Sequence, residues 1–149
     1  MKAQQEVNDM RKCQLDIEKS REVYEYFKDN IKVKECYNNI FHVFELSPKT
    51  FREGKWKIAY GYVEVMAALY CRHCFILDEH GNVIDPTLFV QSEPQFQRDY
   101  YIMAVFDDMD EYLTAIESSD YMPALNKYLL VQDIKAQKWA KENGVIFLG

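Results

Sequence analysis

Three side chains of this sequence could cooperate in nucleophilic chemistry, namely Cys36, His73 and Asp85. A thiol attacks efficiently only as a thiolate, and a neighbouring imidazole can take its proton and later return a proton to a leaving group. A carboxylate on the far ring nitrogen would hold the imidazole in the tautomer that accepts the thiol proton. These residue types together predict a cysteine nucleophile, a base and an orienting acid.

His73 and Asp85 fall on two consecutive predicted strands, 70–78 and 82 to about 90, joined by a hairpin. With a three-residue loop at 79–81, closed by a glycine in the left-handed position, His73 and Asp85 are diagonal neighbours on one face of the sheet. A two-residue loop turns Asp85 to the other face. The simpler alternative, whatever the register, is that His73 is a half-buried strand residue and Asp85 caps the turn before Pro86.

Cys36 stands at the predicted start of a short amphipathic helix, 36–46, whose apolar residues recur at the spacing of one helical face. The partial positive charge of a helix N-terminus favours a thiolate, and Lys32 and Lys34 add positive charge just upstream. The simpler alternative is that Cys36 is only a small apolar residue at a helix start.

Attack by a thiolate on an acyl carbon also needs hydrogen-bond donors for the developing oxyanion. Asn39 is one candidate, because its amide lies one turn after Cys36 on the same predicted helix. Tyr62, on the predicted strand that begins at Trp56, is the second candidate for stabilising the oxyanion or binding substrate.

The remaining pattern predicts a single α+β domain over residues 1–149, with an antiparallel sheet of about four strands. The cysteine-bearing helix packs on this sheet, and further helices flank it at both ends of the chain. The connection 47–55 is predicted to be rich in turns. The other expected elements are a helix over 4–28, broken in its middle, strands from 56 and over 99–106, and helices over 108–118 and 123–141.

Composition excludes several classes of function. The balance of 18 basic and 24 acidic residues gives a net charge of −6, which opposes binding to nucleic acid or to anionic membranes. No apolar run reaches the length of a membrane helix, and the polar N-terminus lacks a signal-peptide pattern, so we expect a cytoplasmic protein. In that compartment the four cysteines are expected to be reduced.

A metal site is the main competing interpretation of the cysteines, since Cys71 and Cys74 have the spacing Cys-x-x-Cys. On a strand, however, residues three apart project from opposite faces, so these two thiols diverge. We therefore expect neither a metal nor another cofactor. His42 and His80 are interpreted as exposed residues, Asp107–Glu111 as a helix start, and the apolar run 100–106 as a buried central strand.

Four segments in this order resemble the papain-like and transglutaminase-like cysteine hydrolases, in particular small phage and bacterial proteins of that kind: Cys36-Tyr37-Asn38-Asn39, Tyr60-Gly61-Tyr62, His73-Cys74-Phe75 and Gly81-Asn82-Val83-Ile84-Asp85-Pro86-Thr87. The resemblance covers about residues 30–90. It implies that Cys36 is the nucleophile, that His73 acts as base and then acid, and that Asp85 orients His73. The sequence departs from the pattern after the histidine, where a small residue and a tryptophan are usual and Cys74 and Phe75 stand here.

The resemblance implies a cysteine-dependent acyl hydrolase or transferase, such as a protease, amidase, deamidase or transglutaminase-like enzyme. Its substrate would be a protein, a peptide or a small amide or acyl compound. The alternative is a non-catalytic binding or inhibitor protein of the same fold, encoded by a phage or a bacterium. The oligomeric state stays open.

Overall fold

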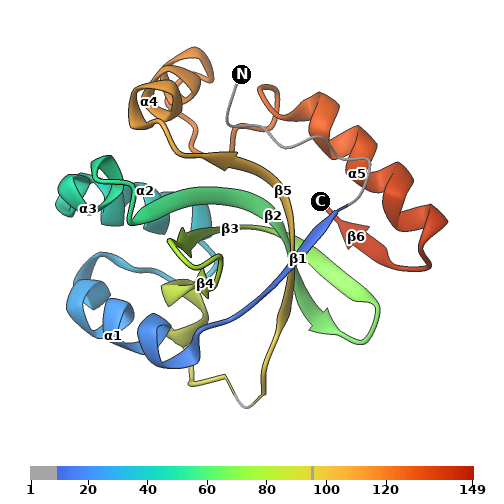
Figure 1. Cartoon of the computed structure of the whole chain (residues 1–149), viewed down its shortest axis with the longest axis horizontal. Coiled ribbons are helices and arrows are strands. Elements are labelled where there is room, and N and C mark those ends of the chain that lie inside the picture. Colours follow the sequence, from blue (N-terminus) through green and yellow to red (C-terminus); the bar gives the residue numbers. More distant parts are fainter. Residues whose placement is uncertain (1–9, 95) are drawn as a thin grey trace.

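The computed structural model describes residues 10–94 and 96–149, and these form an α+β fold with five α-helices and one mixed six-stranded sheet (Figure 1). The first residues of the helix predicted over 4–28 lie outside the described residues. The strands are β1 (Arg11–Gln14), β2 (Trp56–Met66), β3 (Leu69–Asp78), β4 (Val83–Ile84), β5 (Asp99–Phe106) and β6 (Ile146–Leu148). The helices are α1 (Ile17–Phe27), α2 (Cys36–Leu46), α3 (Pro48–Arg52), α4 (Met109–Ser118) and α5 (Leu130–Glu142), with short 3-10 helices at Lys28–Asn30 and Pro86–Phe89.

The strands lie in the order β1-β5-β2-β3-β4, and β6 also pairs with β3. All these pairings are antiparallel except that of β3 with β6, which is parallel. The prediction of about four antiparallel strands was therefore too simple. Both missed strands, β1 and β6, have three or four residues, which is too short for a period-two pattern to stand out.

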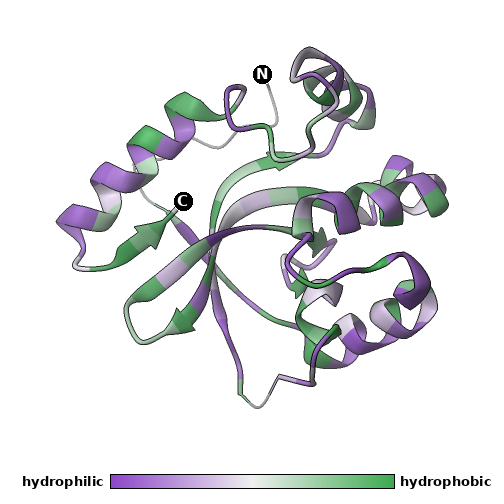
Figure 2. Ribbon diagram, turned by 180° about the vertical axis from the view of Figure 1, so that it is seen from behind, coloured by the Kyte–Doolittle hydropathy of each residue, from purple (hydrophilic) through white to green (hydrophobic). Residues whose placement is uncertain are grey.

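The sheet carries a large core on one face and a smaller one on the other. Tyr60 and Tyr62 of β2 point into the large core, which helices α2, α4 and α5 complete, whereas Ala59 and Val63 point into the smaller one. Figure 2 shows the apolar colour along the central strands and mixed colouring on the helices. Among the described residues, no helix combines the length and the apolar character needed to cross a bilayer.

The beginning of the chain corrects the prediction of a long helix there. Residues 11–14 form β1 on the edge of β5, with Cys13 turned inward. The helix starts only at Ile17, because the side chain of Asp16 accepts a hydrogen bond from the Lys19 amide at 2.9 Å and caps its first turn. A capping aspartate inside an otherwise helical pattern was the available signal for this boundary.

Three further predictions differ from the structure, while the helix over 36–46 and the strand over 99–106 are confirmed. The connection 47–55 contains α3, which Pro48 opens and which buries Phe51 against the core. The strand expected over 82–90 ends at Ile84, because Pro86 has no amide proton for a ladder and opens a 3-10 helix instead. The last helix begins at Leu130 and not at 123, after a run of turns.

The hairpin has the three-residue loop. Ile76 pairs with Ile84 and Leu77 with Val83, so the register continues to Asp78 opposite Asn82. Gly81 takes a φ of +80°, the left-handed position that the turn requires. The register on which a partnership between His73 and Asp85 depends is thereby confirmed.

One edge of β3 is interrupted beside His73. β6 pairs with Leu69–Cys71 and β4 pairs with Ile76–Leu77, so among the described residues 72–75 have β2 on one side and no strand on the other. Adjacent strand residues project from opposite faces, so Arg72 and Cys74 lie toward the large core and His73 lies toward the smaller one. Through this gap, a side chain on one face of the sheet can contact a side chain on the other face.

Gly61, which pairs with His73 across β2 and β3, is required by a close approach of β5. A Cβ atom at this position would lie 1.9 Å from the carbonyl oxygen of Tyr101, which is backbone and cannot rotate away. We expect Gly61→Ala to lower the free energy of unfolding by about 1–3 kcal/mol, as overpacking in a core does. Urea denaturation monitored by circular dichroism measures this change.

Gly81→Asn is the matched control for this substitution. Gly81 has open space around its Cα, and asparagine tolerates the left-handed conformation. A loss of stability equal to that of Gly61→Ala would show that glycine flexibility, and not the contact with Tyr101, is the cause.

Candidate active site

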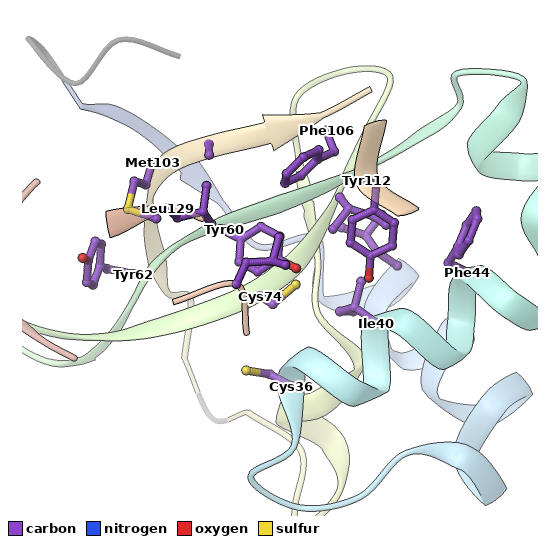
Figure 3. Packing of buried hydrophobic residues seen from close by; sticks show 14 of the residues in the cluster. Cys36, Ile40, Phe44, Tyr60, Tyr62, Cys74, Met103, Phe106, Tyr112 and Leu129 are labelled. Atoms are coloured by element: carbon purple, nitrogen blue, oxygen red, sulfur yellow. The ribbon is translucent and has the colours of Figure 1, made fainter. Parts of the chain in front are cut away.

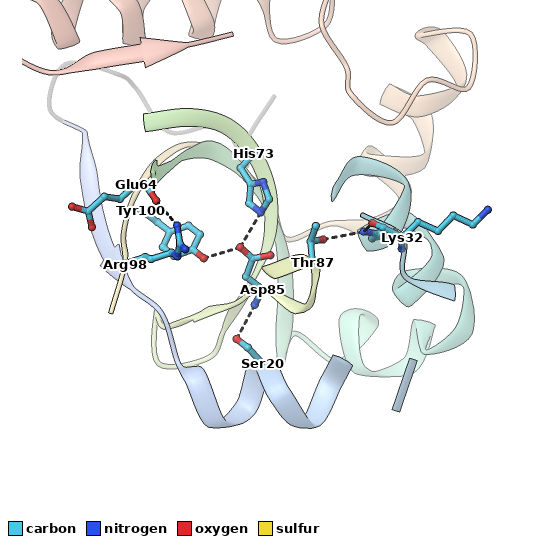
Figure 4. A network of polar contacts seen from close by, with 9 residues as sticks. Ser20, Lys32, Glu64, His73, Asp85, Thr87, Arg98 and Tyr100 are labelled. Atoms are coloured by element: carbon cyan, nitrogen blue, oxygen red, sulfur yellow. Dashed lines mark hydrogen bonds and ion pairs between the residues drawn. The ribbon is translucent and has the colours of Figure 1, made fainter. Parts of the chain in front are cut away.

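His73 and Asp85 are hydrogen-bonded in the structure, with Nε2 of His73 2.8 Å from Oδ2 of Asp85 (Figure 4). The Tyr100 hydroxyl donates to the same oxygen at 2.7 Å. Asp85 is completely buried, and burial together with this carboxylate raises the pKa of Tyr100 well above its usual range. Tyr100 therefore stays a donor, and it fixes the carboxylate beneath the imidazole.

The segment that carries Asp85 is held against α1 as well as against β3. The backbone amide of Asp85 donates to the Ser20 hydroxyl at 2.9 Å, and Ser20 is itself fully buried in α1. The amide of Asp16, which caps the same helix, donates to the Val83 carbonyl at 2.8 Å. The carboxylate is thus positioned by two contacts between the backbone that precedes Pro86 and the start of α1.

Cys36 occupies the first position of α2, and Figure 3 shows its sulfur projecting from the helix start toward β3. The side chain is 7% exposed, and its sulfur lies close enough to His73 to raise the pKa of the imidazole. Since Nε2 of His73 faces Asp85, Nδ1 is the nitrogen left for the thiol. Both residues line a cavity of about 350 Å³. The structure therefore brings the three predicted catalytic residues together.

The environment of His73 favours the imidazolium. Burial of the ring opposes its charge, but the Asp85 carboxylate and the Cys36 sulfur outweigh this loss of hydration and raise the pKa of His73 well above its usual range. A protonated imidazole beside a thiol stabilises the thiolate, and it carries the proton that a leaving group needs.

The first turn of α2 offers backbone donors to the same cavity. The helix has no side-chain cap, because the Glu35 carboxylate accepts from the Asn38 side chain at 3.1 Å instead. In the described part of the chain, the amides of Cys36, Tyr37 and Asn38 have no hydrogen-bond acceptor. The amide of Cys36 is therefore available to an oxyanion formed at its own sulfur.

The assignment of Asn39 as an oxyanion donor was wrong. Its side-chain amide donates to the Lys32 carbonyl at 2.8 Å and to the Thr87 hydroxyl at 3.1 Å, and its oxygen accepts from the Lys32 amide (Figure 4). Both amide protons are used, and the side chain is buried. Asn39 instead ties the helix of Cys36 to the segment that follows Asp85.

Tyr62 is likewise not a donor to the cavity. Its hydroxyl donates to Asp133 of α5 at 2.7 Å, and its ring stacks on Phe147 with centroids 4.0 Å apart. Arg72 binds the same Asp133 oxygen through Nε at 2.9 Å. Tyr62 therefore belongs to the contacts that hold α5 on the sheet.

Tyr37 and Arg72 are among the cavity residues that the sequence analysis did not assign to the site. Tyr37 follows Cys36 directly, lines the cavity, and accepts a hydrogen bond from Nη1 of Arg72 at 2.8 Å. Burial raises the pKa of Tyr37 to about 12, although Arg72 acts in the opposite direction. The hydroxyl proton has no acceptor in the described chain, so Tyr37 can donate it to a bound substrate.

The other candidate ligands and histidines lie away from this cavity. No group of three or more His, Cys, Asp or Glu side chains within the described residues could hold a metal ion. All four cysteines are free thiols, and Cys71 and Cys74 both lie on β3. His42 is exposed on α2 with Nδ1 3.1 Å from Glu45, and His80 is exposed in the hairpin loop.

Comparisons with protein-family models, with curated proteins and with solved structures gave no match for this chain.

The raised pKa of His73 predicts how stability depends on pH. A group whose pKa is higher in the folded state stabilises the fold fully below its unfolded pKa, about 6.5, and loses this contribution as pH rises through the folded value. We expect the stability lost in His73→Gln to be greatest between pH 5.5 and about 6.5 and to shrink at alkaline pH. Urea unfolding of the wild type and of His73→Gln, at acidic and at alkaline pH, measures the difference in their free energies of unfolding.

His80→Gln is the control, because it removes an exposed imidazole from a turn and should change stability by less than about 0.5 kcal/mol. A destabilisation by His73→Gln that grows with pH would mean that burial, and not the carboxylate, dominates at His73.

Proposed function

We propose that the chain is a cysteine-dependent acyl hydrolase or transferase. The observation that carries the proposal is the single imidazole of His73, which hydrogen-bonds to a buried carboxylate and lies beside the Cys36 thiol in the wall of an open cavity. Both nitrogens of any buried imidazole need partners, and what favours chemistry here is that the group beside the second nitrogen is a thiol at a helix N-terminus.

Acylation would begin from the thiolate of Cys36 and the imidazolium of His73. The sulfur attacks the acyl carbon and forms a carbon–sulfur bond, while the carbonyl oxygen becomes an oxyanion that the Cys36 amide can bind. The oxyanion then collapses and expels the amine, alcohol or thiol, which takes the proton from His73. Asp85 holds the ring through these steps and Tyr100 holds Asp85.

Deacylation would reverse the roles of the same groups. His73, now neutral, takes a proton from water or from an amine that attacks the thioester, and the thiolate of Cys36 leaves. Water gives hydrolysis, as in a protease, amidase or deamidase, and an amine gives transfer. The proposed substrates are accordingly proteins, peptides or small amide and acyl compounds.

The fold is consistent with a papain-like or transglutaminase-like core, which we propose on the order Cys36, His73, Asp85 and on a cysteine helix packed against a sheet. Cys74 and Phe75 depart from the usual residues after the histidine. In this chain Cys74 packs below Tyr60 in the large core, and the Phe75 ring lies parallel to His73 with centroids 6.3 Å apart. We place the activity in the reducing cytoplasm of the protein's own cell or of an infected host, since the mechanism needs a free thiol.

Thiol labelling tests the proposed pair of nucleophile and base. With iodoacetamide at pH 6–7 we expect Cys36 to react faster than the other three cysteines, because few ordinary thiols are ionised at this pH. We expect His73→Ala to slow the reaction of Cys36 by about tenfold or more. Peptide mass mapping follows each cysteine separately. His80→Ala is the matched control and should leave the rate unchanged. Equal reactivity of all four cysteines would favour the alternative of a binding or inhibitor protein.

Acylation by p-nitrophenyl acetate tests the donor role of Tyr37. We expect an acetyl group on Cys36, and a rate of acetylation that falls about tenfold to a hundredfold in Tyr37→Phe, because loss of one oxyanion donor costs up to about a thousandfold. Release of p-nitrophenolate measures the rate. Tyr62→Phe removes a hydroxyl from the neighbouring Asp133 contact and serves as control; an equal effect of both variants would refute the direct role of Tyr37.

A further inference from the structure

The cavity beside Cys36 is lined by cationic side chains in a protein that is acidic as a whole. Lys34 and Arg72 belong to its wall, no aspartate or glutamate side chain does, and Gly149 lines it with the backbone carboxylate of the last residue. The sequence carries 24 acidic and 18 basic residues, so a wall with two cationic side chains and no acidic one is not what the composition favours. The local excess of positive charge points to the nature of the ligand.

Arg72 is a fixed part of this wall. Its side chain is 5% exposed, and it is held by Asp133 through Nε and by the Tyr37 hydroxyl and the Ala124 carbonyl through Nη1. Nη2 is buried and has no partner among the described residues. A buried donor without an acceptor is costly, so a ligand oxygen at this wall would recover free energy that the unliganded protein forgoes.

Lys34 supplies the charge that no other group neutralises. Arg72 pairs with Asp133 and His73 pairs with Asp85, whereas Lys34 forms no ion pair in the described part of the chain. The free amides at the start of α2 add a partial positive charge at the same end of the cavity. An anion that enters therefore meets one uncompensated ammonium and several unused donors.

We propose that the cavity binds acyl compounds that carry a carboxylate near the reacting carbonyl, with Lys34 and Arg72 as the carboxylate subsite. The inference rests on the proposed function for the identity of the reacting group, while the subsite itself needs no thiol. It narrows the substrates from acyl compounds in general to half-amides and half-thioesters of dicarboxylic acids and to amides with a free carboxylate. A carboxylate suits this subsite because its two oxygens can accept hydrogen bonds from the planar guanidinium of Arg72 and from the flexible ammonium of Lys34.

Binding to Cys36→Ala separates the subsite from the chemistry. The two probes are glutaramate, an amide with a carboxylate, and glutaramide, its neutral counterpart, titrated by NMR or calorimetry. We expect glutaramate to bind about fivefold more tightly, which corresponds to one charge pair near 4 Å in water, and Lys34→Gln to remove most of this preference. Lys32→Gln is the control, since Lys32 carries the same charge two residues away but does not line the cavity.

Alkylation of intact Cys36 gives a second measurement. The thiolate displaces iodide from either anionic iodoacetate or neutral iodoacetamide, and we expect Lys34→Gln to lower the first rate about threefold to fivefold and leave the second unchanged. Equal effects of Lys34→Gln and Lys32→Gln, or equal binding of the two amides, would overturn the subsite. Preferential binding of glutaramate by Cys36→Ala, together with an unreactive Cys36 in the wild type, would support the subsite and reject the proposed catalysis.

Discussion

The buried carboxylate of Asp85 is the constraint on which the rest of the site depends. A charge without exposure is tolerated only when partners compensate for its lost hydration, and Asp85 finds them on β3 and β5, in His73 and Tyr100. Its backbone is fixed in addition by Ser20 of α1. The same pairing raises the pKa of His73, so one interaction contributes to stability and, in the proposed mechanism, would supply the imidazolium beside Cys36.

The interrupted edge of β3 explains how a thiol and an imidazole on opposite faces of the sheet can meet. His73 projects with Phe75 toward the smaller core, and Cys36 belongs to the larger one. A continuous neighbouring strand would separate them. Because β6 stops at Cys71 and β4 starts opposite Ile76, the two groups lie at a place where the sheet has no backbone between its faces.

Local signals predicted much of this arrangement, and long-range contacts account for what they missed. The sequence left two hairpin registers open, and the structure has the one in which Gly81 takes the left-handed position, whereas the bounds of α2 followed directly from its apolar spacing. The short strands β1 and β6 depend on partners far along the chain. A side chain's use also cannot be inferred from its type: the amide of Asn39 was interpreted as a free donor, but its protons bind Lys32 and Thr87, the second of which lies 48 residues away.

The contact between Arg72 and α5 shows why the residues around the nucleophile are hard to assign from spacing alone. Asp133 accepts from both Arg72 and Tyr62, so a helix near the end of the described chain fixes the guanidinium that in turn orients Tyr37 beside Cys36. Each member has an ordinary structural explanation when it is considered singly. Only their sequence of contacts, from α5 through β3 to the first turn of α2, holds the hydroxyl of Tyr37 against a buried cation beside Cys36, and hydrogen bonds in series polarise one another.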